Sequence, residues 1–272
     1  MSTPKAPSPT EFFASAPAPT LSGNTPWADR YSRDLKRVFH EHAARAPRTL
    51  QQHLGPSELG SPCDRQVAGK MAGLPTTNHV SDPWPSIRGT ALHAWAADAF
   101  EGDNKRSNVL RWIAEQKVTP HPDHPGTADL YDAVTRSVVD HKFLGASSMQ
   151  KIRSQAGPPR HYVVQLLLYG QGYRLLGLPV DRVVLAAYPA TAATLDGMWV
   201  WERPHTPADD ELIAVVFEET KRRREWAEKL AAGLATLSQI PASPSDDGCY
   251  FCPFYRPEDP TGKDTCPGHQ TY

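Results

Sequence analysis

The sequence of 272 residues has few cysteines, no long apolar run and almost no net charge. Its 29 basic residues (lysine and arginine) balance 30 acidic ones, which excludes a surface that is positively charged all over. Any contact with nucleic acid therefore requires a local basic patch. No apolar run has the length of a membrane span, and the N-terminus lacks the charged-then-apolar order of a secretory signal. We expect a cytoplasmic protein without membrane contacts.

Common catalytic patterns are also missing. The sequence shows no Ser-His-Asp arrangement, no glycine-rich phosphate loop and no internal repeat. These absences remove hydrolases with a serine nucleophile and nucleotide-binding P-loops from consideration. The chemistry must come from other acidic, basic and histidine side chains.

The scarce cysteines lie at the two ends of the sequence. In a cytosolic protein, four cysteines favour a metal site over disulfides. The first and second are 249 − 63 = 186 positions apart, so a shared site would connect the start of the domain to its end and restrict the unfolded chain. Their spacing fits zinc as well as an iron–sulfur cluster, and His269 could replace the last cysteine in a zinc site. The four are Cys63, Cys249, Cys252 and Cys266.

Composition suggests one domain after a tail. Residues 1–25 are rich in proline, alanine, serine and threonine, and we expect them to be a disordered tail. Residues 26–272 form one domain in this interpretation. Its helical segment with the first cysteine covers 26–84, its core covers 85–240, and its cysteine-rich segment covers 241–272.

Hydrophobic periodicity gives the order of elements. It predicts helices over 27–54, 86–100, 107–116, 160–176 and 208–237. It predicts strands near 118 and over 128–133, 138–143, 182–188 and 198–202, with a polar loop over 145–157. This order indicates an α/β fold with a mixed central β-sheet flanked by helices.

Residues 126–142 contain the pattern that bears most directly on chemistry. Two short apolar runs with acidic residues are joined by a polar turn. Asp140 and Lys142 are two residues apart and share a face of a strand. If the turn holds an even number of residues, Asp129 lies on that face too, unless a bulge intervenes. The alternative is a surface hairpin with solvated charges.

Three other features could add to this face. His93 lies one helical turn after Gly89, where the missing side chain leaves room beside the imidazole. Gln165 and Tyr169 are four apart and share a helix face. Each has a simpler explanation, a half-buried histidine or a tyrosine at the edge of the core. The basic run 221–224 either is a solvated face or follows a phosphate backbone.

Together these residues suit phosphodiester hydrolysis. Two carboxylates can hold a magnesium ion, which typically also binds waters and a substrate phosphate. A histidine as third ligand favours manganese somewhat. Such an ion lowers the pKa of a bound water, and a neighbouring lysine can hold that water or neutralise charge on the phosphate.

Four spaced motifs resemble the RecB-like branch of the PD-(D/E)XK nucleases. Gly89–His93 (GTALH) resembles its G-x-x-x-H element, and Gly126–Asp129 (GTAD) with Val138–Lys142 (VVDHK) resembles the two halves of its signature. Gln165–Tyr169 (QLLLY) resembles its Q-x-x-x-Y element. One cysteine before these motifs and a group after them resemble the iron–sulfur branch, which includes CRISPR-associated exonucleases and AddB-type nuclease domains.

The resemblance implies a metal-dependent DNA exonuclease acting on single-stranded or frayed ends in recombination, repair or CRISPR adaptation. It implies Mg²⁺ or Mn²⁺ on His93, Asp129 and Asp140, with Lys142 positioning or activating the water. It also implies DNA contacts by Gln165 and Tyr169, to which we add Lys151 and Arg160 as candidates. A [4Fe-4S] cluster on Cys63, Cys249, Cys252 and Cys266 is implied as well, with Zn²⁺ as the alternative.

Three departures from the family pattern stand out. Asp140 replaces the more common glutamate, Asp64 follows Cys63 where a proline is common, and the last two cysteines are widely spaced. Two functions of another class remain open. One is a non-catalytic nucleic-acid-binding or assembly module with a structural iron–sulfur or zinc site. The other is a structural zinc protein with an unrelated α/β core.

Overall fold

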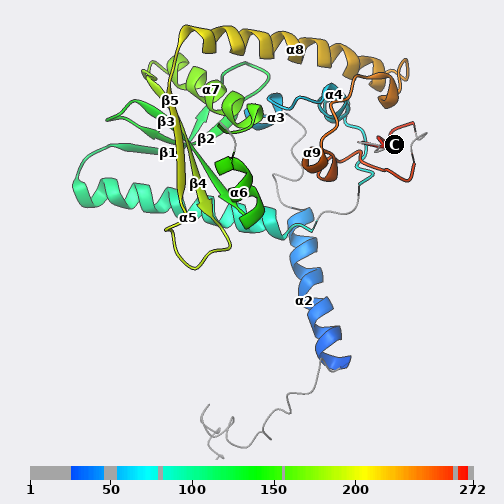
Figure 1. The fold of residues 1–272 in the computed structure, drawn as a ribbon, viewed down its shortest axis with the longest axis horizontal. Coiled ribbons are helices and arrows are strands. Elements are labelled where there is room, and N and C mark those ends of the chain that lie inside the picture. Colours follow the sequence, from blue (N-terminus) through cyan, green and yellow to red (C-terminus); the bar gives the residue numbers. More distant parts are fainter. Residues whose placement is uncertain (1–25, 46–53, 79–81, 155–156, 260–262, 269–272) are drawn as a thin grey trace, which may run out of the picture. The chain divides into compact units, whose positions relative to one another are not determined.

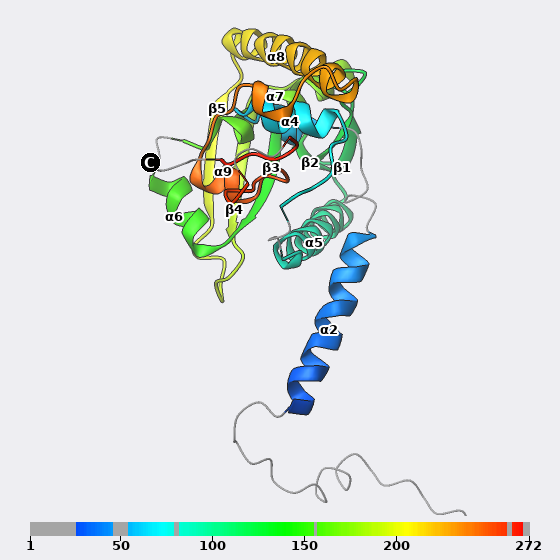
Figure 2. The same cartoon turned by 90° about the vertical axis from the view of Figure 1, so that its right-hand side faces the viewer.

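The computed structural model describes residues 26–45, 54–78, 82–154, 157–259 and 263–268 (Figures 1 and 2). The expected tail, 1–25, lies outside these residues, as does His269. The chain divides into two compact units, Met1–Ala46 and Pro47–Tyr272. Among the described residues, no helix has both the length and the apolar character needed to cross a membrane.

Helix α2 (Pro26–Ala44) is the described element of the first unit. It ends well before residue 54, where we expected the first helix to end, and residues 46–53 lie outside the described part. The division between the two units follows Ala46, and the domain bounds predicted from the sequence, 26–272, stay a prediction. The apolar residues of α2, among them Trp27 and Phe39, are exposed.

A five-stranded sheet forms the centre of the second unit, in the order β1-β2-β3-β4-β5. The first three strands form an antiparallel meander, β4 runs parallel to β3, and β5 is antiparallel to β4. The sheet is therefore mixed, as the sequence predicted. Its strands are β1 (Trp112–Val118), β2 (Gly126–Asp132), β3 (Ser137–Leu144), β4 (Arg182–Pro189) and β5 (Trp199–Pro204).

Helices surround this sheet. The parallel connection from β3 to β4 runs through two of them, α6 and α7, as a parallel pair requires. The helices of this unit are α3 (Pro56–Leu59), α4 (Asp64–Met71), α5 (Trp84–Ser107), α6 (Ala146–Ser154), α7 (Arg160–Leu175), α8 (Pro207–Ala231), the 3-10 turn η1 (Leu237–Gln239) and α9 (Asp246–Tyr250).

The alternation of side chains along the strands assigns the two sheet faces. Val138 of β3 is buried in one apolar core with residues of α7, and Tyr131 of β2 packs 4.8 Å from the ring of Tyr173 of α7. His141 of β3 lies three residues after Val138 and therefore points to the opposite face, where its ring stacks on Phe100 of α5. Helices α7 and α5 thus cover opposite faces, and both approach the central hairpin.

Two predicted segments are wrong. The expected helix over 107–116 is instead the end of α5 and most of β1, because Asn108 adopts a left-handed conformation (φ 53°) that ends α5. The side chain of Asn104 then accepts hydrogen bonds from the backbone N–H of Arg111 and Trp112. The expected loop over 145–157 contains α6, in which Met149 and Ile152, three residues apart, are buried.

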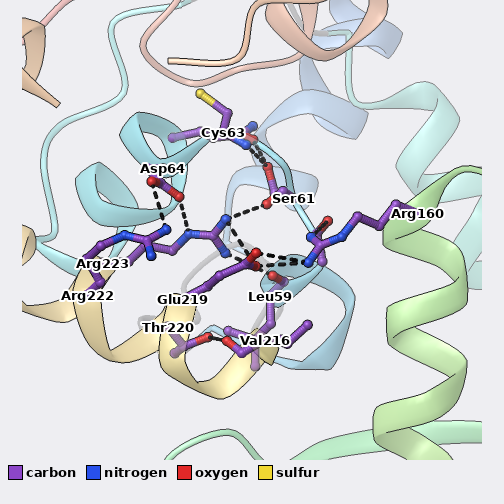
Figure 3. Close-up of polar contacts among 12 residues, drawn as sticks. Leu59, Ser61, Cys63, Asp64, Arg160, Val216, Glu219, Thr220, Arg222 and Arg223 are labelled. Atoms are coloured by element: carbon purple, nitrogen blue, oxygen red, sulfur yellow. Dashed lines mark hydrogen bonds and ion pairs between the residues drawn. The ribbon is translucent and has the colours of Figure 1, made fainter. Parts of the chain in front are cut away.

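The basic run 221–224 is not a uniform face. Arg223 is 2% exposed and donates to Asp64 Oδ1 at 2.7 Å and to the carbonyls of Leu59 and Ser61 at 3.0 and 2.8 Å (Figure 3). Asp64 is the residue that departs from the family pattern. Its carboxylate is the nearer of two counter-charges of the buried Arg223, the other being Glu219 at 3.8 Å, and it thereby fastens the segment of Cys63 to α8.

Two glycines inside helices give a matched test of how closely α5 and α7 are packed at these positions. A Cβ at Gly89 of α5 would meet nothing within 4 Å, whereas one at Gly172 of α7 would lie 2.6 Å from Val118 Cβ. We expect Gly89→Ala to raise the free energy of unfolding by about 0.5–1 kcal/mol, because alanine favours helix. Gly172→Ala should lower it by roughly 1–3 kcal/mol through overpacking. Urea denaturation of both variants checks this, and equal effects would contradict it.

Candidate functional site

Asp140 is a carboxylate in the interior of the protein. It is 0% exposed, and its Oδ1 has no hydrogen-bond partner among the described residues. Lys142, two residues further along β3, places Nζ 2.7 Å from Asp140 Oδ2 as an ion pair. A buried carboxylate is costly without a cation, and Lys142 neutralises its single negative charge by contact with Oδ2. The other oxygen, Oδ1, is left with the capacity to bind a positive centre.

Helix α7 fixes the lysine from the other side. Lys142 Nζ donates to Gln165 Oε1 at 3.0 Å, and Gln165 Nε2 donates to the hydroxyl of Tyr169 at 3.3 Å. The same Nζ lies 4.8 Å from the ring centroid of Tyr162. Gln165 and Tyr169 are themselves buried, with 6% and 5% exposure. In this structure the QLLLY motif therefore positions Lys142, while a contact of these two side chains with DNA stays a prediction.

Asp129 lies where the hairpin strands stop pairing. The paired register of β2 and β3 ends at Leu130 with Val139, so its continuation sets Asp129 opposite Asp140. Instead of a ladder bond, the N–H of His141 donates to Asp129 Oδ2 at 2.7 Å. The turn between the paired strands holds four residues, 133–136, which is the even number expected for two acids on one side.

His93 of α5 reaches the same carboxylate from the opposite face of the sheet. Its Nδ1 lies 3.5 Å from Asp129 Oδ1, and its ring meets Phe143 edge-on with centroids 5.1 Å apart. The side chain keeps 25% of its surface exposed. It is thus a half-buried histidine beside a carboxylate, in a place where a ligand can be approached from solvent.

Burial and like charge change the protonation of the acidic pair. Burial, followed by the charge of Asp140, raises the pKa of Asp129 to about 8. Burial also raises the pKa of Asp140, although Lys142 opposes the shift. Burial lowers the pKa of Lys142, but the two carboxylates outweigh it and the net pKa is raised. Without another cation, the carboxylate pair therefore retains a proton near neutral pH.

Glu115 is a neighbour of this site that the sequence did not reveal. It lies in β1 opposite Asp129, because the pairs Ala114 with Leu130 and Gln116 with Ala128 flank it. Ligand atoms of Glu115, Asp129 and His93 all lie within 4.8 Å of one another. The helix expected over 107–116 hid this relation, since only the register of β1 against β2 brings Glu115 beside Asp129.

The four cysteines line one cavity of about 60 Å³. Burial raises the pKa of Cys252 to about 11, against a backbone hydrogen bond from Phe254 that lowers it, and the charges of the other three cysteines add smaller increases. Arg65 donates from Nη1 to Cys266 Sγ at 3.1 Å. The sulfurs are not clustered as tightly as the His93 group, in which all ligand atoms lie within 4.8 Å of one another. A compact tetrahedral site, with sulfurs about 4 Å apart, is therefore not preformed among the described residues.

The remaining two candidates for DNA contact lie on helices. Lys151 is exposed on α6. Arg160, the first residue of α7, pairs with Glu219 of α8 at 3.0 Å and donates to the carbonyl of Gly60 at 3.4 Å (Figure 3). Arg160 thus connects three segments of the fold, and a contact of Lys151 or Arg160 with DNA stays a prediction.

Comparison with known proteins gives only distant similarities. No family model matches the chain, and no curated protein is detectably similar in sequence. An alkaline exonuclease from Laribacter hongkongensis is similar in structure at 13% identity, with 65% of this chain and 96% of that one covered and a TM-score of 0.39. Its complex with dAMP gives 15% identity, 65% and 96% coverage and a TM-score of 0.40.

A phage-related exonuclease from Haemophilus somnus 129PT is similar at 12% identity, with 67% of this chain and 96% of that one covered and a TM-score of 0.43. At such identities and TM-scores, these similarities decide neither fold nor function. The functional assignment depends on the chemistry of the site itself.

The raised pKa of Asp129 gives a test in stability. In the unfolded chain an aspartate has a pKa of about 3.9. Because the folded pKa is near 8, folding takes up a proton between these values, and the stability of the metal-free protein should fall as pH rises from 4 to 8. Added Mg²⁺ competes with that proton. We therefore expect a larger increase of Tm with Mg²⁺ at pH 9 than at pH 6, measured by calorimetry, whereas a larger increase at pH 6 would contradict the shift.

Proposed function

We propose that this protein is a divalent-cation-dependent nuclease that hydrolyses phosphodiester bonds of DNA. The observation that supports it best is the buried Asp140, whose Oδ1 has no hydrogen-bond donor among the described residues while Oδ2 pairs with Lys142, beside Asp129. Such an arrangement is unfavourable for stability alone. A cation and a phosphate arriving together would compensate the carboxylates and use the lysine.

The donor set fits a hard divalent cation. Asp129 and Asp140 supply carboxylate oxygens and His93 an imidazole nitrogen, the ligand types that suit Mg²⁺ or Mn²⁺. When bound, the ion supplies a Lewis acid that acidifies a water and neutralises charge on the phosphate. Helix α5 delivers the histidine and the hairpin delivers the two acids, so the site forms only in the folded protein.

Lys142 supplies a second positive charge beside the cation. Its ammonium group is held charged by Asp140 and directed by Gln165 and Tyr162. From this position Nζ can orient the attacking water or donate to the phosphoryl oxygen on which negative charge builds up. Gln165 and Tyr169 are positioning residues in this scheme, because they act through the lysine.

Action at DNA ends is the finer part of the proposal. The preference for single-stranded or frayed ends, and a role in recombination, repair or CRISPR adaptation, follow from the motif resemblance. A non-catalytic nucleic-acid-binding module is the alternative. The buried Asp140–Lys142 pair argues against it, because binding of a phosphate backbone needs surface charge rather than a buried acid and base.

Digestion of end-labelled single- and double-stranded DNA with Mg²⁺ or Mn²⁺ tests this proposal. Lys142→Ala should lose cleavage by several orders of magnitude while DNA affinity is retained, because transition-state stabilisation is removed. Lys105→Ala, which changes an exposed lysine in the last turn of α5, is the matched control and should cleave like the unmodified protein. Normal turnover of Lys142→Ala at saturating cation would contradict the assigned role.

We also propose that the four cysteines hold a [4Fe-4S] cluster, with zinc as the alternative. The shared cavity, its wall of four cysteines and the donor Arg65 support this, since cluster sulfurs commonly accept hydrogen bonds. Holding one group between Cys63 and the C-terminal cysteines closes a chain loop of 186 residues (249 − 63) and stabilises the fold.

Anaerobic purification gives a direct check of this cluster. We expect brown protein with close to four irons per chain and little zinc, as a [4Fe-4S] cluster requires. Cys63→Ser should remove the colour and lower Tm of the whole domain, rather than abolish cleavage selectively. Colourless, fully active protein with one tightly bound zinc would show that the cluster assignment is wrong.

A further inference from the structure

We infer that Glu115 is a ligand of the cation held at Asp129 and His93, a role that the nuclease-like motifs do not assign. The inference rests on the proposed function, because it adds a residue to the same site. The cation position lies on the β1 side of Asp129, whereas the Asp140–Lys142 pair lies on its β3 side. The probe that it predicts is a hard divalent cation such as Mn²⁺.

The geometry of three side chains carries the inference. One ligand atom from each of Glu115, Asp129 and His93 lies within 4.8 Å of the others. These separations suit ligands arranged around a single small ion. The three residues come from β1, β2 and α5, so the fold brings them together from separate elements. Glu115 is exposed, whereas Asp129 and His93 are partly buried, which leaves the position open to ions from solvent.

The backbone of β1 is distorted at this residue. Glu115 has φ 49° inside a strand, while pairing with β2 continues on both sides of it. A residue other than glycine or asparagine seldom adopts this left-handed conformation, and such strain is concentrated at functional sites. The strain and the short ligand distances occur at the same residue. The left-handed conformation of Glu115 costs stability, and ligand binding at this residue would offset that cost.

Asp140 gives a second and independent indication of a ligand here. Its carboxylate is completely buried beside Asp129, and its Oδ1 has no hydrogen-bond donor among the described residues, whereas Oδ2 pairs with Lys142. Asp140 and Lys142 balance each other in charge. The ionised carboxylates of Glu115 and Asp129 together carry a charge of −2, which a single divalent cation neutralises.

Titration of the full-length protein with Mn²⁺, followed by the electron paramagnetic resonance of free Mn²⁺, tests the inference. Loss of an outer-shell partner already weakens metal affinity about 10–100-fold, so Glu115→Gln, which removes a ligand, should weaken Mn²⁺ binding at least about tenfold. Glu218→Gln, at an exposed site on α8, is the control and should bind Mn²⁺ like the unmodified protein.

A second variant separates ligand loss from misfolding. Asparagine tolerates the left-handed conformation, so Glu115→Asn should melt at the same temperature as the unmodified metal-free protein or higher, and still bind Mn²⁺ weakly. Loss of affinity in both variants with Tm retained supports the inference. Undiminished Mn²⁺ affinity in Glu115→Gln and Glu115→Asn would overturn it while leaving the nuclease proposal in place. Absence of Mn²⁺ binding in the unmodified protein would overturn both.

Discussion

The ion pair of Asp140 and Lys142 in the interior of the second unit is the interaction on which the site depends. Burial penalises both charges, which compensate each other, and the lysine has a further partner in the amide oxygen of Gln165. Helix α7 covers this face of the sheet and brings Gln165 to the lysine, while Asp129 approaches the carboxylate from β2. The parallel pairing of β3 with β4 keeps the pair in the centre of the sheet rather than at an edge.

The surroundings of the site are held by equally specific polar contacts. Arg223 is buried in α8 and satisfied by Asp64 and two carbonyls, which fixes the segment that carries Cys63. Arg65 fastens the same segment to the C-terminal part through Cys266. Removing either arginine would leave buried acceptors without donors, an effect larger than that of a surface ion pair.

The sequence predicted the parts of the site that depend on short spacing. The alternation around Asp140 and Lys142 gave one shared face, and a mixed sheet followed from the order of elements. Relations across long separations were not accessible. Glu115 joins the site through strand register, and Arg223 meets Asp64 across 159 residues. The QLLLY motif was found, but only packing reveals that Gln165 is buried against Lys142 instead of lying at the surface.

The central claim is that a pair of buried acids is retained for a cation at the expense of stability. Asp129→Asn tests it most directly, because asparagine can still accept the hydrogen bond from His141 while one of two repelling charges is removed. In chelator at pH 9, the free energy of unfolding should be higher for Asp129→Asn than for the unmodified protein, and Mg²⁺ should stabilise only the latter. An equal response of both proteins to Mg²⁺, or a less stable metal-free Asp129→Asn, would contradict the claim.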